Sequence, residues 1–255
     1  MSRPVFVAEH HHDILNAWAE IRRGRDAPFR LITFDFHTDT LPAFNRYALK
    51  KLELDLGRVT TRPEHAELCA QLAAAVDFRD AASVKRAVSW LRHDEHIDCA
   101  RRAGMVSDVA LVLSTDTPGN TPDFGLLFPA SSGASSGVPT PQTGPFGEIC
   151  GVGAPAQVAA ELLESPVLAP KVAAIAEAWG GLGEYIVDID LDFFRSSASA
   201  APREASAFEQ LLLGSLAVTI ARESRCVVEG RLPGESITAD SLLAQLRRFT
   251  ERGRS

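Results

Sequence analysis

Residues 184–194 read EYIVDIDLDFF, an apolar segment whose second half carries an aspartate at every other position. Residues 30–39 read RLITFDFHTD, a second apolar segment that ends in the pattern D-x-H-x-D. Both segments predict strands that end in acidic residues. Because side chains along a strand alternate between two faces, we expect the polar residues of each motif to share one face.

The rest of the chain alternates between strand and helix patterns. Strands are expected at 4–8, 109–114 and 217–221, and helical patterns at 14–21, 64–100, 156–163, 171–179, 207–216 and 238–250. This alternation predicts an α/β fold in three layers, with a central, mostly parallel sheet flanked by helices. The segment 115–155 is rich in Gly, Pro, Ser and Thr, so we expect a long loop inserted in a single domain that spans 1–255.

Composition limits the classes of partner and compartment. With 45% hydrophobic and 23% charged residues, the 255-residue chain is typical of a soluble globular domain. It lacks the run of roughly 20 apolar residues that a membrane span needs. The 26 basic and 33 acidic residues leave a net charge of −7, which argues against nucleic acid or an anionic membrane as partners. Four widely spaced cysteines favour a reducing compartment, the cytoplasm.

The clustered aspartates of the two motifs need a compensating charge. Burying such carboxylates without partners costs several kcal/mol each, and neither motif contains Arg or Lys. In parallel α/β sheets, ligands bind at the carboxyl ends of the strands, where both motifs are expected. We therefore predict a divalent metal site there. Solvated strand ends or helix caps are the alternative that needs no metal.

The histidines indicate which metal would bind. All seven precede residue 97, and three of them, His10, His11 and His12, follow the first expected strand. A shell of carboxylate oxygens with one or two imidazoles suits Mn²⁺ better than Zn²⁺. Four or more carboxylates carry enough charge for two ions about 3.5–4 Å apart.

These motifs resemble those of a known superfamily. Residues 35–39 resemble the D-x-H-x-D motif of the ureohydrolases, the arginase and deacetylase superfamily. Residues 186–192 resemble its later D-x-D motif, and residues 9–11 its G-D-H segment. With H-D-E-H-I at 93–97, the chain resembles more closely a divergent branch of peptide arginases. Those enzymes convert arginine side chains of ribosomally made precursor peptides to ornithine and release urea.

The resemblance implies an arginase-like fold and two Mn²⁺ ions held by six residues. It places one ion on His11, Asp35, Asp39 and Asp190, and the other on His37, Asp35, Asp190 and Asp192. The register stays open, because Asp188 and Asp190 could instead be the aspartate pair of the later motif.

Some positions depart from the superfamily pattern. His10 replaces the aspartate of G-D-H, and Leu41 replaces an asparagine that holds the α-carboxylate of free arginine. The stretch 41–53 also lacks the histidine that transfers a proton in those enzymes. These departures suit an arginine locked in a peptide, with His93 or His96 as the replacement proton donor. A charged helix terminus is the alternative explanation of those two histidines.

A guanidinium substrate also needs a carboxylate partner. The resemblance favours Glu223, which follows the last strand, as a catalytic and substrate-binding residue, with Glu229 second. Asp188 and Glu95 are further candidates for contacting the substrate. An isolated surface glutamate is the alternative for the first two.

Two other functions stay open. One is a deacetylase-type amidohydrolase with a single zinc, acting on acylated lysine or a polyamine. The other is a non-catalytic, metal-stabilised peptide-binding protein. The expected partner is an arginine-containing precursor peptide, and assembly into a homo-oligomer is left open.

Overall fold

The computed structural model describes residues 3–54, 62–115, 125–128, 130 and 160–251. Within them, six strands form one sheet in the order β1-β6-β5-β2-β3-β4, and all five neighbouring pairs are parallel. The strands are β1 (Val5–Ala8), β2 (Phe29–Asp35), β3 (Val106–Leu113), β4 (Leu126–Phe128), β5 (Tyr185–Asp190) and β6 (Val218–Ala221). This sheet, flanked by helices, confirms the predicted α/β class.

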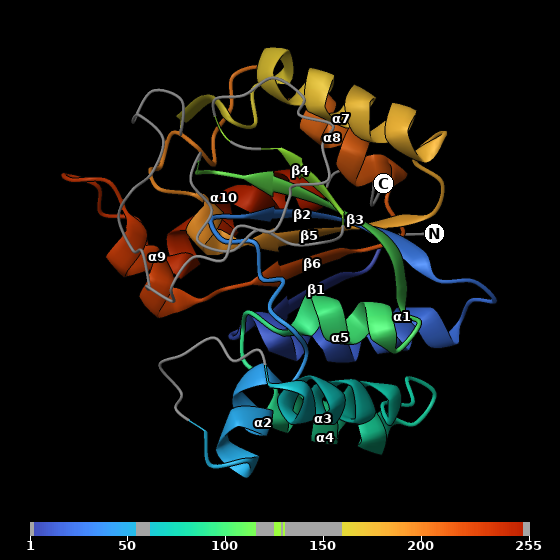
Figure 1. Cartoon of the computed structure of the whole chain (residues 1–255). Coiled ribbons are helices and arrows are strands. Elements are labelled where there is room, and N and C mark those ends of the chain that lie inside the picture. The colour runs from blue at the N-terminus through green and yellow to red at the C-terminus, as the bar shows by residue number, and fades with distance from the viewer. Residues whose placement is uncertain (1–2, 55–61, 116–124, 129, 131–159, 252–255) are drawn as a thin grey trace.

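Helices cover both faces of the sheet (Figure 1). On one side lie η1 (His11–Ile14), α1 (Leu15–Arg23), α2 (Asn45–Lys51), α3 (Pro63–Ala74), α4 (Ala81–Trp90) and α5 (His96–Arg102). On the other lie α7 (Ser165–Trp179), α8 (Ser206–Gly214) and α10 (Ala239–Thr250), while η2 (Leu191–Phe193) and α9 (Ser224–Gly230) follow β5 and β6.

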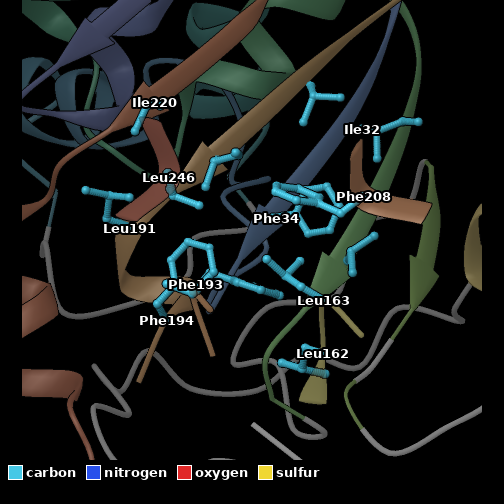
Figure 2. Packing of buried hydrophobic residues seen from close by; sticks show 14 of the residues in the cluster. Ile32, Phe34, Leu162, Leu163, Leu191, Phe193, Phe194, Phe208, Ile220 and Leu246 are labelled. Atoms are coloured by element: carbon cyan, nitrogen blue, oxygen red, sulfur yellow. The ribbon is translucent and has the colours of Figure 1, made fainter. Parts of the chain in front are cut away.

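Each face of the sheet has its own hydrophobic core. Phe34 of β2 points into the core under α8 (Figure 2). Its ring packs edge-on against the rings of Phe193 and Phe208, with centroids 5.5 and 5.7 Å apart. Leu31 of the same strand packs into the other core, with α1 and α5. Strand alternation therefore leaves Asp35 on the α1 side of the sheet, at the end of β2.

The strand order switches direction at the sheet's centre, between β2 and β5. From β2 the chain proceeds to β3 on one side, whereas from β5 it proceeds to β6 on the other. Parallel sheets bind ligands at the carboxyl ends of strands where the order switches in this way. Both acidic motifs lie at this point, because β2 ends at Asp35 and β5 at Asp190.

Some elements differ from those predicted. The helical pattern over 64–100 is three helices, α3, α4 and α5, separated by turns. The expected loop 115–155 contains strand β4, whose three apolar residues pair with β3; so short a run has no detectable periodicity. The remainder of that loop lies mostly outside the described residues. Helices α2 and α9, of seven residues each, were not predicted.

The structure also bears on membrane and thiol expectations. Among the residues it describes, no helix has the length and apolar character to cross a membrane. Cys69 and Cys99 are buried free thiols, and Cys226 is half-buried. Cys150 lies outside the described residues.

Candidate metal centre

Each acidic motif leaves its strand in a turn, after Asp35 in β2 and after Asp190 in β5. Asp35 Oδ1 accepts a hydrogen bond from the backbone N–H of His37 at 2.8 Å, and Asp190 Oδ1 accepts one from that of Asp192 at 3.1 Å. These local hydrogen bonds end β2 at Asp35 and β5 at Asp190. The expectation that strand alternation carries on to 39 and 192 is therefore wrong.

Asp39 adopts a left-handed backbone with φ of 48°. Among non-glycine residues, aspartate is one of the few that tolerates this conformation. Asp39 Oδ2 lies 2.8 Å from His11 Nδ1. Strained backbone held in place by its surroundings is common at binding sites.

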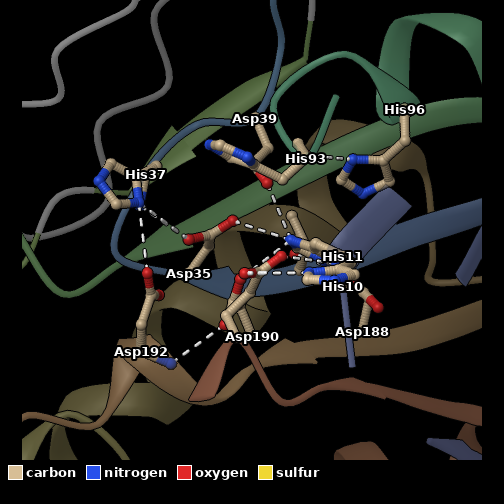
Figure 3. Close-up of polar contacts among 12 residues, drawn as sticks. His10, His11, Asp35, His37, Asp39, His93, His96, Asp188, Asp190 and Asp192 are labelled. Carbon is tan, nitrogen blue, oxygen red and sulfur yellow. Dashed lines mark hydrogen bonds and ion pairs between the residues drawn. The ribbon is translucent and has the colours of Figure 1, made fainter. Parts of the chain in front are cut away.

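His11 is the centre of the first group of potential ligands. It is fully buried in η1, directly after β1. Besides Asp39, its Nδ1 lies 3.2 Å from Asp190 Oδ2 and 3.6 Å from Asp35 Oδ2 (Figure 3). These four residues offer ligand atoms that all lie within 4.8 Å of one another. The structure thus brings together the set expected for one ion.

A second group of potential ligands adjoins the first and shares Asp35. His37 Nδ1 lies 3.4 Å from Asp192 Oδ2 and 4.0 Å from Asp35 Oδ1. These three residues also offer ligand atoms within 4.8 Å of one another. Asp190, expected in both sets, falls in the first group only. The His37 side chain is 40% exposed, so this group lies on the open side of the site.

The carboxylates of these groups have few donors of their own. Asp35 is fully buried, and its Oδ2 accepts no hydrogen bond from the described residues. Burial and the neighbouring Asp39 and Asp192 raise the pKa of Asp35 well above its ordinary value. Burial and Asp192 raise the pKa of Asp190 to about 8. A divalent cation would supply the missing positive charge, so these buried groups fit a metal ion.

His37 and Asp192 stabilise each other's charge without a metal. Burial alone would lower the pKa of His37, but the hydrogen bond and charge of Asp192 raise it to about 9. Burial alone would raise the pKa of Asp192, but His37 keeps it below its ordinary value. The two side chains therefore form an ion pair at the more exposed edge of the site.

Asp188 lies on the far side of His11 from the other aspartates (Figure 3). Its Oδ2 is 2.7 Å from His11 Nε2 and accepts a 3.0 Å hydrogen bond from Thr33, and its Oδ1 accepts one from Thr219 at 2.5 Å. Asp188 is fully buried, and its expected contact with a substrate stays a prediction. The threonines were missed, although Thr33 stands two residues before Asp35 in an apolar strand.

The two candidate proton donors lie in different environments. His96 is fully buried, and its ring centroid is 4.2 Å from that of His11. Its Nδ1 lies 2.7 Å from the carbonyl oxygen of His93, while its Nε2 has no partner among the described residues. Burial and His11 lower the pKa of His96 well below its ordinary value. A neutral, enclosed His96 does not suit proton exchange with solvent, whereas His93 is exposed.

Of the three glutamates expected to contact substrate, only Glu223 is at the site. Its Oε1 accepts a 2.8 Å hydrogen bond from the backbone N–H of His11. Glu229 is a surface residue of α9, 43% exposed and paired with Arg225 at 2.6 Å. Glu95 is fully buried between two backbone segments, where it accepts hydrogen bonds at 2.8 and 3.2 Å. The expected substrate contacts of Glu229 and Glu95 stay predictions.

The candidate centre therefore unites the ends of strands that are far apart in the sequence. The residues gathered there are His11, Asp35, His37, Asp39, Asp190 and Asp192, with Asp188, His96 and Glu223 packed against His11. Comparison with protein-family models, curated proteins and solved structures gives no match.

Proposed function

We propose that the protein is a binuclear manganese hydrolase that converts peptidyl arginine to ornithine and releases urea. Its place would be the maturation of a ribosomally made peptide in the cytoplasm. The observation that carries the proposal is the pair of adjoining ligand groups that share Asp35 at the carboxyl ends of β2 and β5. Oxygen-rich shells with one imidazole each favour Mn²⁺ over Zn²⁺.

The chemistry divides between the cations and the chain. When bound, two divalent cations supply a water of lowered pKa and positive charge near the reacting carbon. Asp35 turns its two oxygens toward different groups, Oδ2 toward His11 and Oδ1 toward His37, which suits a bridging ligand. The partly exposed His37 marks the side from which a side chain would enter.

The surrounding residues support a cationic side chain as substrate. Glu223 uses Oε1 for the His11 N–H, and its Oε2 lies 3.9 Å from His10 Nδ1, so one oxygen stays available for a guanidinium. His93 is the exposed histidine to which we assign protonation of the departing ornithine amine. Leu41 offers no side-chain donor for an α-carboxylate, which favours a peptide over the free amino acid.

Mass spectrometry of a candidate precursor peptide after incubation with enzyme and Mn²⁺ tests the proposal. We expect a loss of about 42 Da per modified arginine, together with urea, from hydrolysis by a metal-activated water. Asp190→Asn should abolish both. A matched control is Asp108→Asn, which alters an exposed aspartate on β3 that pairs with Arg30 at 3.2 Å.

Metal content separates the alternatives. Two manganese ions per chain support the proposal, whereas one zinc with deacylation of lysine or a polyamine supports the deacetylase type. A protein that binds metal and peptide, but neither changes the mass of the peptide nor releases urea, supports the non-catalytic binder.

A further inference from the structure

A row of polar side chains crosses the centre of the sheet beneath His11. Thr33 of β2, Asp188 of β5 and Thr219 of β6 are direct register partners on adjacent strands. All three are fully buried on the face that α1 covers. A folded protein tolerates polar groups that are buried in this way when all of their hydrogen bonds are made.

The direction of the hydrogen bonds in this row follows from the groups that make them. Trp18 Nε1, which can only donate, lies 3.2 Å from Thr219 Oγ1. Thr219 therefore accepts there and gives its own proton to Asp188 Oδ1. Thr33 donates to the other oxygen of Asp188. Asp188 is the final acceptor of the network.

This network decides which nitrogen of His11 carries a proton. Nε2 lies 2.7 Å from an oxygen of Asp188 that already acts as an acceptor, so Nε2 must donate. A ring nitrogen that donates a hydrogen bond cannot bind a cation at the same time. The nitrogen left for a metal is Nδ1, the one that faces Asp35, Asp39 and Asp190.

We infer that Asp188 is a positioning residue: with Thr33 and Thr219 it holds His11 as the Nε2–H tautomer and turns Nδ1 toward the cation site. Carboxylates commonly orient metal-binding histidines through the second ring nitrogen. The inference deepens the proposed metal centre and rests on it. It also argues against a cation shared by His11, His96 and Asp188, because such an ion would displace the hydrogen bond between His11 and Asp188.

The tautomer of His11 can be observed directly. Protein labelled with ¹⁵N-histidine is saturated with ¹¹³Cd²⁺, a diamagnetic substitute for Mn²⁺, and long-range ¹H–¹⁵N spectra are recorded, with His11→Asn to assign the His11 signals. We expect a protonated Nε2 and cadmium coupling to Nδ1. Coupling to Nε2, or a protonated Nδ1 in the loaded protein, overturns the inference.

Cation affinity provides the second measurement. In calorimetric titration with Mn²⁺, Asp188→Asn should bind about 10–100-fold more weakly, the usual effect of losing such an orienting carboxylate. Thr219→Val should weaken binding in the same direction, and the control Asp108→Asn should leave it unchanged. Equal affinity in folded Asp188→Asn and wild type contradicts the inference. Should Asp188→Asn not fold, Thr219→Val and the wild-type spectra decide.

These outcomes separate the positioning role from the proposed reaction. A wild-type protein that binds cation through Nδ1 but never releases urea supports the role of Asp188 and overturns the hydrolysis. A wild-type protein that binds neither Mn²⁺ nor Cd²⁺ overturns the metal centre and the positioning role together.

Discussion

Two clusters of histidines and acids in the described part of the chain are satisfied in different ways. The turn cluster, residues 93–98, contains Glu95 and Asp98, which accept hydrogen bonds from backbone N–H groups. Asp98 also pairs with Arg102 at 2.7 Å. These carboxylates hold the start of α2 against the turn before α5, a structural task.

The strand-end cluster consists of His11, Asp35, His37, Asp39, Asp190 and Asp192. Its carboxylates face one another around two histidines, and Asp35 Oδ2 has no donor among the described residues. The contrast shows that residue type alone does not identify a binding site. What distinguishes the two clusters is the balance of carboxylates and donors. The strand-end cluster gathers four carboxylates around two histidines, and a cation could provide the further positive charge that they need.

The largest expected effect concerns the response to cation. At Mn²⁺ about 100-fold above Kd, binding should stabilise wild type by about 2.7 kcal/mol, or roughly 5–10 °C in Tm. Asp190→Asn should lose most of this shift because it removes a ligand. Differential scanning fluorimetry with Mn²⁺ and with EDTA measures it. Asp98→Asn, the matched change in the turn cluster, should keep the Mn²⁺-induced rise in Tm. Loss of that rise in both variants would show that the two clusters do not differ in cation binding.

Glu95→Ala should lower the stability of the protein and leave its response to Mn²⁺ unchanged. Two backbone N–H groups lose their buried acceptor, so the free energy of unfolding should fall by about 2–4 kcal/mol. Urea denaturation measures the change, and the Mn²⁺-induced shift should persist. Glu95→Gln, which retains one acceptor oxygen, is the milder control. A Glu95→Ala protein of wild-type stability would show that the turn cluster is not structural.

The metal-free protein should lose stability as pH rises from 7 to 9. Folding raises the pKa of Asp190 to about 8 and of His37 to about 9, so the folded state holds these protons more tightly than the unfolded state. The contribution of these protons to folding stability is complete at a pH below the pKa values of the unfolded state. It is lost as the pH rises through the pKa values of the folded state. Tm measured in EDTA should therefore fall across this range, and saturating Mn²⁺ should reduce the fall. A Tm in EDTA that rises with pH would contradict it.

The smallest effect is expected at Glu229. It is exposed and pairs only across one turn of α9, so Glu229→Gln should change stability by less than about 0.5 kcal/mol. Urea release from peptide should also stay unchanged. Glu223→Gln, at the site, should reduce that release. Equal loss of urea release in the two variants would place Glu229 at the substrate after all.

The fold class and the acidic motifs were predictable because their signals are local. Short apolar runs identified five of the six described strands, and the spacing of aspartates identified both motifs. The helices of seven residues and strand β4 carry too few residues for a period to be recognised. The roles of Glu95 and Asp188 were also missed, since their partners come from other elements.

The sequence by itself determined that acidic residues would end two buried strands, because hydrophobic patterning and aspartate spacing are properties of short segments. Only the tertiary structure decided that β2 and β5 are neighbours, that Asp188 lies behind His11, and that Glu95 is enclosed by backbone donors. These facts depend on strand order and on hydrogen-bond partners distant in the chain. Thr33 and Asp188, for example, are 155 positions apart and yet share a hydrogen bond.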